Sequence, residues 1–156
     1  MIMTRSAIAV LAAVCLGAGA VLVAPAAFLV LTYGCTAEDD RFATALAGLS
    51  ILDVHPVTAT PQGERDSSCD DDDRIVTVWQ SYRSSGPSAD VLSFYRDAAF
   101  MDGWKPLMGE DGEETGCFVK PVGVSDLHLS VSMGEETYDA DYDVDVSSSA
   151  DGGGWC

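Results

Sequence analysis

The stretch Asp126-Leu127-His128-Leu129-Ser130-Val131-Ser132-Met133 decides the fold class, because apolar and polar residues alternate along its whole length. The same alternation runs through residues 137–147, where every second position from 139 to 145 is an aspartate. A period of two is typical of antiparallel strands that bury one face and leave the other in water. We therefore predict an antiparallel sheet in which a hairpin turn at Gly134-Glu135-Glu136 joins these two strands.

Two further strands and a helix precede this pair. Residues 116–122 form a strand after the acidic turn Glu110–Glu114, and residues 75–82 are rich in β-branched and aromatic residues on both faces, which predicts a central strand. Between them, Pro87 suits the first turn of a helix capped by Ser85 or Ser88. We expect this helix to end at Gly103, with Trp104 folded back on its last turn. The following aromatic residues are expected in the core: Trp79, Tyr82, Tyr95, Trp104 and Phe118.

The region before residue 75 has weaker signals. Residues 38–50 place apolar side chains at helical spacing, residues 51–60 indicate a short edge strand, and residues 61–73 are polar and predict a loop. The predicted order is α-β-β-α-β-β-β, an α+β fold with helices on one face of the sheet. We divide the chain into a segment 1–35, a domain 36–147 and a flexible Gly/Ser tail 148–156.

The N-terminal segment has a different composition. The 25 residues from Ala7 to Leu31 carry no charge, and as a helix they would span roughly 37 Å, more than the ~30 Å hydrocarbon core of a membrane. Arg5 precedes the run and acidic residues follow it, so the positive-inside rule places the N-terminus in the cytoplasm. We predict an N-terminal transmembrane helix, an uncleaved signal anchor, that leaves the domain outside the cell membrane.

Two alternatives for this segment remain open. Ala24-Pro25-Ala26 fits a signal-peptidase site, which would release a secreted protein. Gly34 before Cys35 fits a lipoprotein whose Cys35 is acylated, although Thr32 and Tyr33 suit that pattern poorly. All three interpretations place the domain outside the cell membrane.

The charge balance excludes one class of partner. The chain has 8 basic and 25 acidic residues, a formal net charge of −17. All the acidic residues lie at or after Glu38, so the domain presents no basic surface for phosphate groups. Nucleic acid is therefore not an expected partner.

Four cysteines lie in the part that we place outside, where disulfides are the default state. We predict a bond between Cys69 and Cys117, because both flank expected core strands. Cys156 is left to pair with Cys35, to pair with another chain or to stay free. Cys15 lies inside the apolar run and is expected to be inert.

The aspartates at alternate positions of the last strand are the most unusual pattern. They share one face, spaced about 6.5–7 Å apart, and such a row could recruit Ca²⁺, which prefers several oxygen ligands. The competing interpretation is a solvated acidic face that protects the sheet from aggregation. The four candidate metal ligands are Asp139, Asp141, Asp143 and Asp145.

One stretch, Val91-Leu92-Ser93-Phe94-Tyr95-Arg96-Asp97-Ala98-Ala99 followed by Gly103-Trp104, resembles a group of small actinobacterial proteins. The strand from Val78 to Tyr82 and the segment from Cys117 to Lys120 share this resemblance, which covers roughly residues 69–146. The group consists of membrane-anchored or lipid-anchored proteins with no assigned function. The resemblance implies an extracytoplasmic α+β domain and no particular substrate.

No catalytic pattern stands out in the sequence. Nucleophile-elbow, zinc-protease and P-loop motifs are absent, and the two histidines, His55 and His128, have no spacing that indicates metal or acid–base chemistry. We expect no enzymatic activity and no cofactor. The favoured function is a binding or accessory module that engages another protein of the cell envelope. A Ca²⁺-binding surface protein and a cell-envelope hydrolase are the alternatives.

Overall fold

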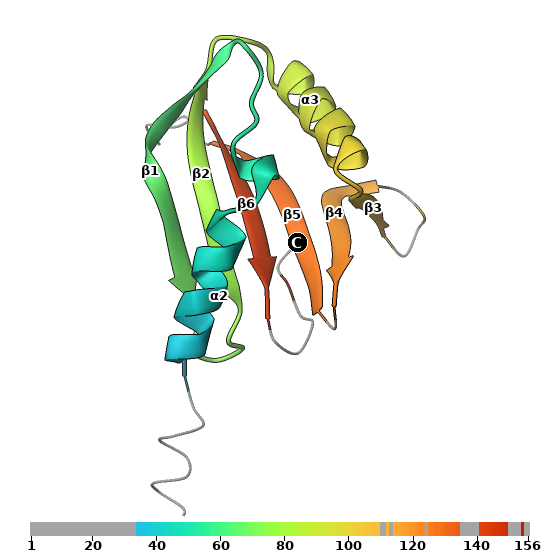
Figure 1. Ribbon diagram of the computed structural model, residues 1–156. Coiled ribbons are helices and arrows are strands. Elements are labelled where there is room, and N and C mark those ends of the chain that lie inside the picture. Colours follow the sequence, from blue (N-terminus) through green and yellow to red (C-terminus); the bar gives the residue numbers. More distant parts are fainter. Residues whose placement is uncertain are drawn as a thin grey trace, which may run out of the picture. The chain divides into compact units, whose positions relative to one another are not determined.

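The computed structural model describes residues 34–109, 112, 114–123, 125–134, 141–149 and 154 (Figure 1). By its contacts the chain divides into two compact units, Met1–Tyr33 and Gly34–Cys156, and every described residue belongs to the second. The predicted membrane anchor therefore lies outside the described residues. Among the helices that are described, none is long and apolar enough to cross a membrane.

The second unit is an α+β domain built on one six-stranded sheet, in which all neighbouring strands are antiparallel in the order β1-β2-β6-β5-β4-β3. Two α-helices and a 3₁₀ helix lie against one face of the sheet (Figure 1). The helical elements are α2 (Ala37–Ala47), η1 (Ser50–Leu52) and α3 (Ser88–Met101). The strands are β1 (Ala59–Cys69), β2 (Val76–Ser84), β3 (Lys105–Met108), β4 (Glu114–Val122), β5 (Ser125–Met133) and β6 (Tyr142–Ser148).

Alternation places the core between the sheet and the helices. The residues of β2, β6 and β5 that face the helices are mostly buried, among them Val78 of β2, Val144 of β6 and Leu129 of β5. The opposite, outer face carries Asp143 and Asp145, as the period of two predicts. Four of the five aromatic residues expected in the core are buried, whereas Trp79 is half-buried on the outer face.

Polar contacts fix helix α2 at both ends. Thr36 and Asp39 form a capping box, and Arg74 pairs with the buried Asp39 carboxylate at 2.9 Å. At the other end the Arg65 guanidinium of β1 donates hydrogen bonds to the Ala47 carbonyl of α2 and to the Leu52 carbonyl of η1. A helix leaves its last carbonyls without intrahelical partners, so a cation here stabilises its C-terminus.

Buried apolar side chains hold helix α3 against the sheet. Val91, Tyr95 and Ala99 recur at helical spacing and are buried against the sheet. The helix ends as predicted: Gly103 has a φ of +83°, and the Trp104 amide donates to the Ala99 carbonyl at 2.9 Å. The predicted serine caps are wrong, because Pro87 occupies the N-cap position and no side chain caps this helix.

The structure corrects the expected elements between residues 50 and 73. The predicted strand over 51–60 is a 3₁₀ turn followed by a connection, and the predicted loop over 61–73 holds most of β1. Strand β1 is at the edge of the sheet, and most of its side chains are exposed, so it has no apolar alternation to reveal it. Pro61 is tolerated within it because an edge strand has one row of backbone groups that pair with nothing in the sheet.

Three further expectations change. Strand β3 was not predicted, because its four residues are too few to show a period. Met133 pairs with Tyr142, and the Gly134 amide donates to the Asp141 carbonyl, so the connection spans 134–141 instead of a tight turn at 134–136. The predicted tail from residue 148 begins too early, because Ser148 belongs to β6 and both Ser148 and Ser149 are buried.

The disulfide prediction is also wrong. Cys69 is bonded to Cys35, with the two Cα atoms 6.2 Å apart. Cys117 lies on β4, four strand spacings from β1, or about 19 Å, whereas a disulfide needs Cα atoms within about 7 Å. The bond also occupies the Cys35 sulfur, which acylation would require, so the structure contradicts lipidation at Cys35.

Candidate functional site

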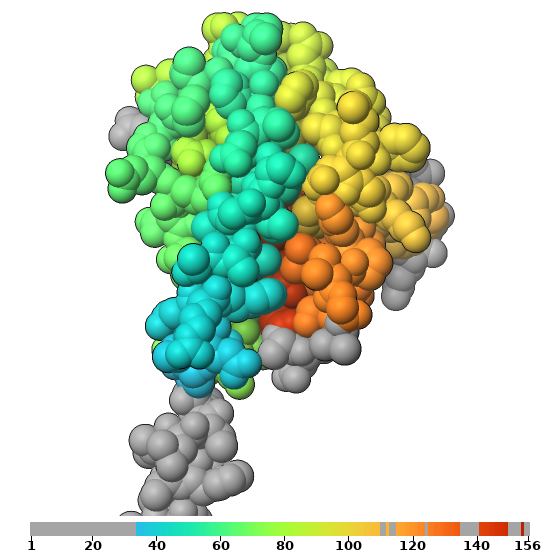
Figure 2. Space-filling view, in the orientation of Figure 1, coloured from blue at the N-terminus to red at the C-terminus, as the bar shows by residue number. Residues whose placement is uncertain are grey.

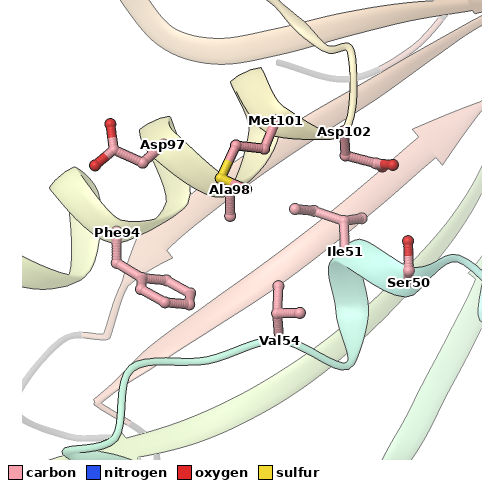
Figure 3. A pocket seen from close by; sticks show the side chains of 8 residues that line it. All are labelled: Ser50, Ile51, Val54, Phe94, Asp97, Ala98, Met101 and Asp102. Atoms are coloured by element: carbon pink, nitrogen blue, oxygen red, sulfur yellow. The ribbon is translucent and has the colours of Figure 1, made fainter.

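An apolar groove separates η1 from α3 on the helical side of the sheet. It has a volume of about 400 Å³. Phe94, Ala98 and Met101 of α3 face Ile51 and Val54 across it (Figure 3). Figure 2 shows the same region from outside, where residues of η1 and α3 meet at the surface. The full lining is Ser50, Ile51, Val54, Phe94, Asp97, Ala98, Met101 and Asp102.

Buried tyrosines hold the η1 wall in place. The Tyr82 hydroxyl donates to the Leu52 carbonyl at 2.8 Å, and the Tyr95 hydroxyl donates to the Val54 carbonyl at 2.9 Å. Burial raises the pKa of both tyrosines, so each hydroxyl keeps its proton and remains a donor. The sheet and α3 thus fix both ends of the segment 52–54.

The α3 wall continues into an exposed apolar ridge. Phe100 is 78% exposed and Met101 is 86% exposed, at the last turn of a helix whose other face is buried. Phe100 itself lines a second hollow of about 240 Å³, together with Arg96, Trp104 and Pro106 among others. Large apolar side chains between two hollows are the kind of surface that partner proteins cover.

Two carboxylates border the groove with different environments. Asp102 accepts hydrogen bonds from Lys120 and from the Trp104 indole, each at 3.0 Å, so its charge is compensated within the domain. Asp97 lies on the exposed side of α3. The groove therefore combines an apolar floor with an acidic rim.

The predicted cation site is only partly described, since Asp139 lies outside the described residues. Asp141 accepts from the Ser84 amide, Asp143 accepts from the Ser81 hydroxyl, and Asp145 accepts from Ser130 and Ser132. Burial, together with the neighbouring Asp143 charge, raises the pKa of Asp145 to about 6. Within the described part of the chain, no group of three His, Cys, Asp or Glu side chains could hold a metal ion. The Ca²⁺ site stays a prediction.

The structure does not bring the two histidines together. His55 contacts the ring of Tyr82, with the centroids 5.3 Å apart, on the helical side of the sheet. His128 alternates with the buried Leu127 and Leu129 and therefore faces the outer side. An acid–base or metal pair made of these two residues is not formed.

Comparisons with known proteins give no functional lead, because no family model, no curated protein and no solved structure matches this chain. The resemblance to small actinobacterial envelope proteins stays a prediction. Sequence reasoning missed the groove because its η1 wall lies in residues that were expected to form a strand. The available signal is the set of apolar residues between Phe94 and Met101, interrupted by Arg96 and Asp97, which covers more than one face of a helix.

Proposed function

We propose that this chain is a membrane-anchored extracytoplasmic module, without enzymatic activity, that binds another protein of the cell envelope. The observation that carries the proposal is the apolar groove between η1 and α3 with the exposed ridge of Phe100 and Met101 beside it. Exposed aromatic and methionine side chains next to a preformed hollow are typical of binding surfaces.

The disulfide bonds support the proposed location of the domain outside the cytoplasm. Cys35 and Cys69 are bonded to each other, and Cys117 is also disulfide-bonded. Disulfides persist in oxidising compartments and are rare in the cytosol. This agrees with the orientation that the N-terminal apolar run predicts from its flanking charges.

The lining of the groove favours a partner segment that combines an apolar and a basic side chain. The floor would accept a large apolar side chain, and the Asp97 carboxylate at the rim complements a lysine or arginine. The groove lies open to solvent beside a protruding ridge, which suits a polypeptide segment better than an enclosed small molecule. The proposed partner is therefore an envelope protein that presents a basic-apolar segment.

Site-specific photo-crosslinking in intact cells tests the proposal on the full-length chain. A photo-reactive residue at Met101 is compared with one at Val122, an apolar residue that is 52% exposed and does not line the groove. We expect Met101 to capture one dominant envelope protein that Val122 does not capture. Identical products from both positions, or capture of a small apolar molecule alone, would overturn the proposal.

Binding of the captured protein to the purified full-length chain provides the quantitative test. We expect Met101→Asp to weaken the affinity about tenfold or more, because it places a charge on an apolar contact. Asp97→Lys is expected to weaken it as well, whereas Val122→Asp should leave it within about twofold. Equal effects of Met101→Asp and Val122→Asp would show that the groove is not the binding surface.

A further inference from the structure

Cys117 is joined by a disulfide to a cysteine outside the described residues. Cys117 is disulfide-bonded, while Cys35 and Cys69 are bonded to each other. The sequence contains two more cysteines, Cys15 and Cys156. Cys15 falls in the apolar run that we assign to the membrane, whereas Cys117 lies in the domain outside it.

The position of Gly154 points to Cys156. A Cβ atom added to Gly154 would lie 2.0 Å from Cδ2 and 2.5 Å from Cγ of His128, so the backbone at residue 154 rests directly on the imidazole ring. Real Cβ atoms do not approach so closely, so a larger residue would require the His128 ring to shift. Gly154 therefore lies against the outer face of β5 at His128.

The pairing of β4 with β5 places Cys117 within reach of Cys156, which lies two residues after Gly154 in the sequence. His128 pairs with Val119 of β4, and Cys117 lies two residues before Val119 on the same outer face. Two residues along a strand span about 7 Å, and two extended residues from Gly154 to Cys156 span a similar distance. Cα atoms of disulfide-bonded cysteines are usually about 5.5–6 Å apart, a separation that this spacing allows.

We propose that Cys117 and Cys156 form a disulfide that fastens the C-terminal segment across the outer face of β4 and β5. Each thiol loses its proton, the two sulfurs form one S–S bond, and two electrons reduce the disulfide of a thiol–disulfide oxidant to its dithiol form. The buried positions of Cys117, Ser147 and Ser149 on this side of the sheet agree with such a cover. The proposal is independent of the groove.

This cross-link has a consequence for recognition. With the outer face of β4 and β5 covered, the groove on the helical side remains open. The C-terminal segment would thus be a structural part of the domain and not a free tail.

Peptide mapping of the full-length protein, purified from an oxidising compartment and kept under non-reducing conditions, gives the first test. We expect a peptide pair joined through Cys117 and Cys156 that dithiothreitol separates. A bond from Cys117 to Cys15 or to a second chain would overturn the proposal, as would alkylation of both cysteines without reduction.

A pair of substitutions tests the role of Gly154. After oxidative refolding with glutathione, we expect Gly154→Ala to raise the fraction of Cys156 open to alkylation about fivefold, because the added Cβ collides with His128. The double variant with His128→Ala provides room for that Cβ, and we expect it to restore closure. If Gly154→Ala leaves the same fraction of Cys156 open to alkylation as the natural chain does, the contact with His128 does not guide formation of the disulfide.

Discussion

Helices α2 and α3 lie on the same face of one sheet, and different interactions hold each of them there. Helix α2 has a capping box, an ion pair to Arg74 and a disulfide at Cys35 beside its first turn. Helix α3 has no side-chain cap and relies on Val91, Tyr95 and Ala99, which are buried. Helix α2 buries few apolar residues and has polar and covalent attachments, whereas α3 is attached through its buried apolar face.

The two modes of attachment leave different surfaces. The residues that hold α3 all lie on one side, which allows Phe100 and Met101 to remain exposed on the other. Helix α2 has acidic residues in its first turn and buries only Asp39 and Leu46. The recognition surface that we propose therefore lies beside the helix that is held by apolar packing.

The largest expected effect is at Tyr95. Tyr95→Ala removes a fully buried ring that contacts Phe94 and Tyr142, and we expect it to lower the free energy of unfolding by about 4 kcal/mol. Chemical denaturation of the full-length protein in detergent measures this. Tyr95→Phe is the control, since it keeps the ring and removes only the hydrogen bond to Val54, at a cost of about 1 kcal/mol. Equal losses in the two variants would contradict attachment of α3 by burial.

The disulfide beside α2 is expected to have the next largest effect. Replacing both Cys35 and Cys69 by serine should cost about 3 kcal/mol, because the bond closes a loop with a sequence separation of 34 residues. In this double variant, amide hydrogen exchange should accelerate more in α2 and η1 than in α3. Uniform acceleration in both helices would mean that the bond stabilises the whole domain and does not specifically hold α2.

A smaller effect is expected from the charge on Asp39. Burial raises the pKa of this carboxyl, but hydrogen bonds from Thr36 and Arg74, together with the Arg74 charge, outweigh burial and hold it below the ordinary value. A lowered folded-state pKa stabilises the fold above the unfolded pKa of about 3.9, and this contribution is lost as the pH falls through the folded value. We expect Asp39→Asn to cost about 1–2 kcal/mol at pH 7, and this cost to decrease as the pH falls through the folded-state pKa.

Denaturation curves between pH 2 and pH 7 measure this difference. Asp40→Asn is the matched control, because it removes the same charge from an exposed position in the same helical turn. A pH-independent cost of Asp39→Asn would show that shape, and not charge, makes Asp39 important.

The smallest effect on stability is expected at the exposed end of α3. Phe100→Ser should change the free energy of unfolding by less than about 0.5 kcal/mol, because the side chain is 78% exposed. Thermal and chemical denaturation check this value. If the same variant weakens binding of the captured partner while the stability is unchanged, recognition and folding are separated on this helix. A loss of several kcal/mol would instead place Phe100 among the residues that hold α3.

The sequence alone determined the α+β class, the strand β5, the alternation along β6 and the end of α3 at Gly103. These features depend on local patterns, namely a period of two in a half-buried strand and a glycine that accepts a positive φ. Tertiary structure decided the rest. The edge strand β1 is held by backbone pairing with β2 and needs no apolar side chains, so the sequence does not mark it.

Tertiary structure, and not local sequence, also determined the candidate site. Ile51 and Val54 face Phe94 and Met101 in a segment that is held by the Tyr82 and Tyr95 hydroxyls, which come from distant parts of the chain. The partner of Cys69 likewise followed from long-range packing, because the strand order puts Cys117 four strands away and Cys35, just before α2, is bonded to Cys69. Local pattern specifies which face of an element is buried, and long-range packing specifies which buried faces meet.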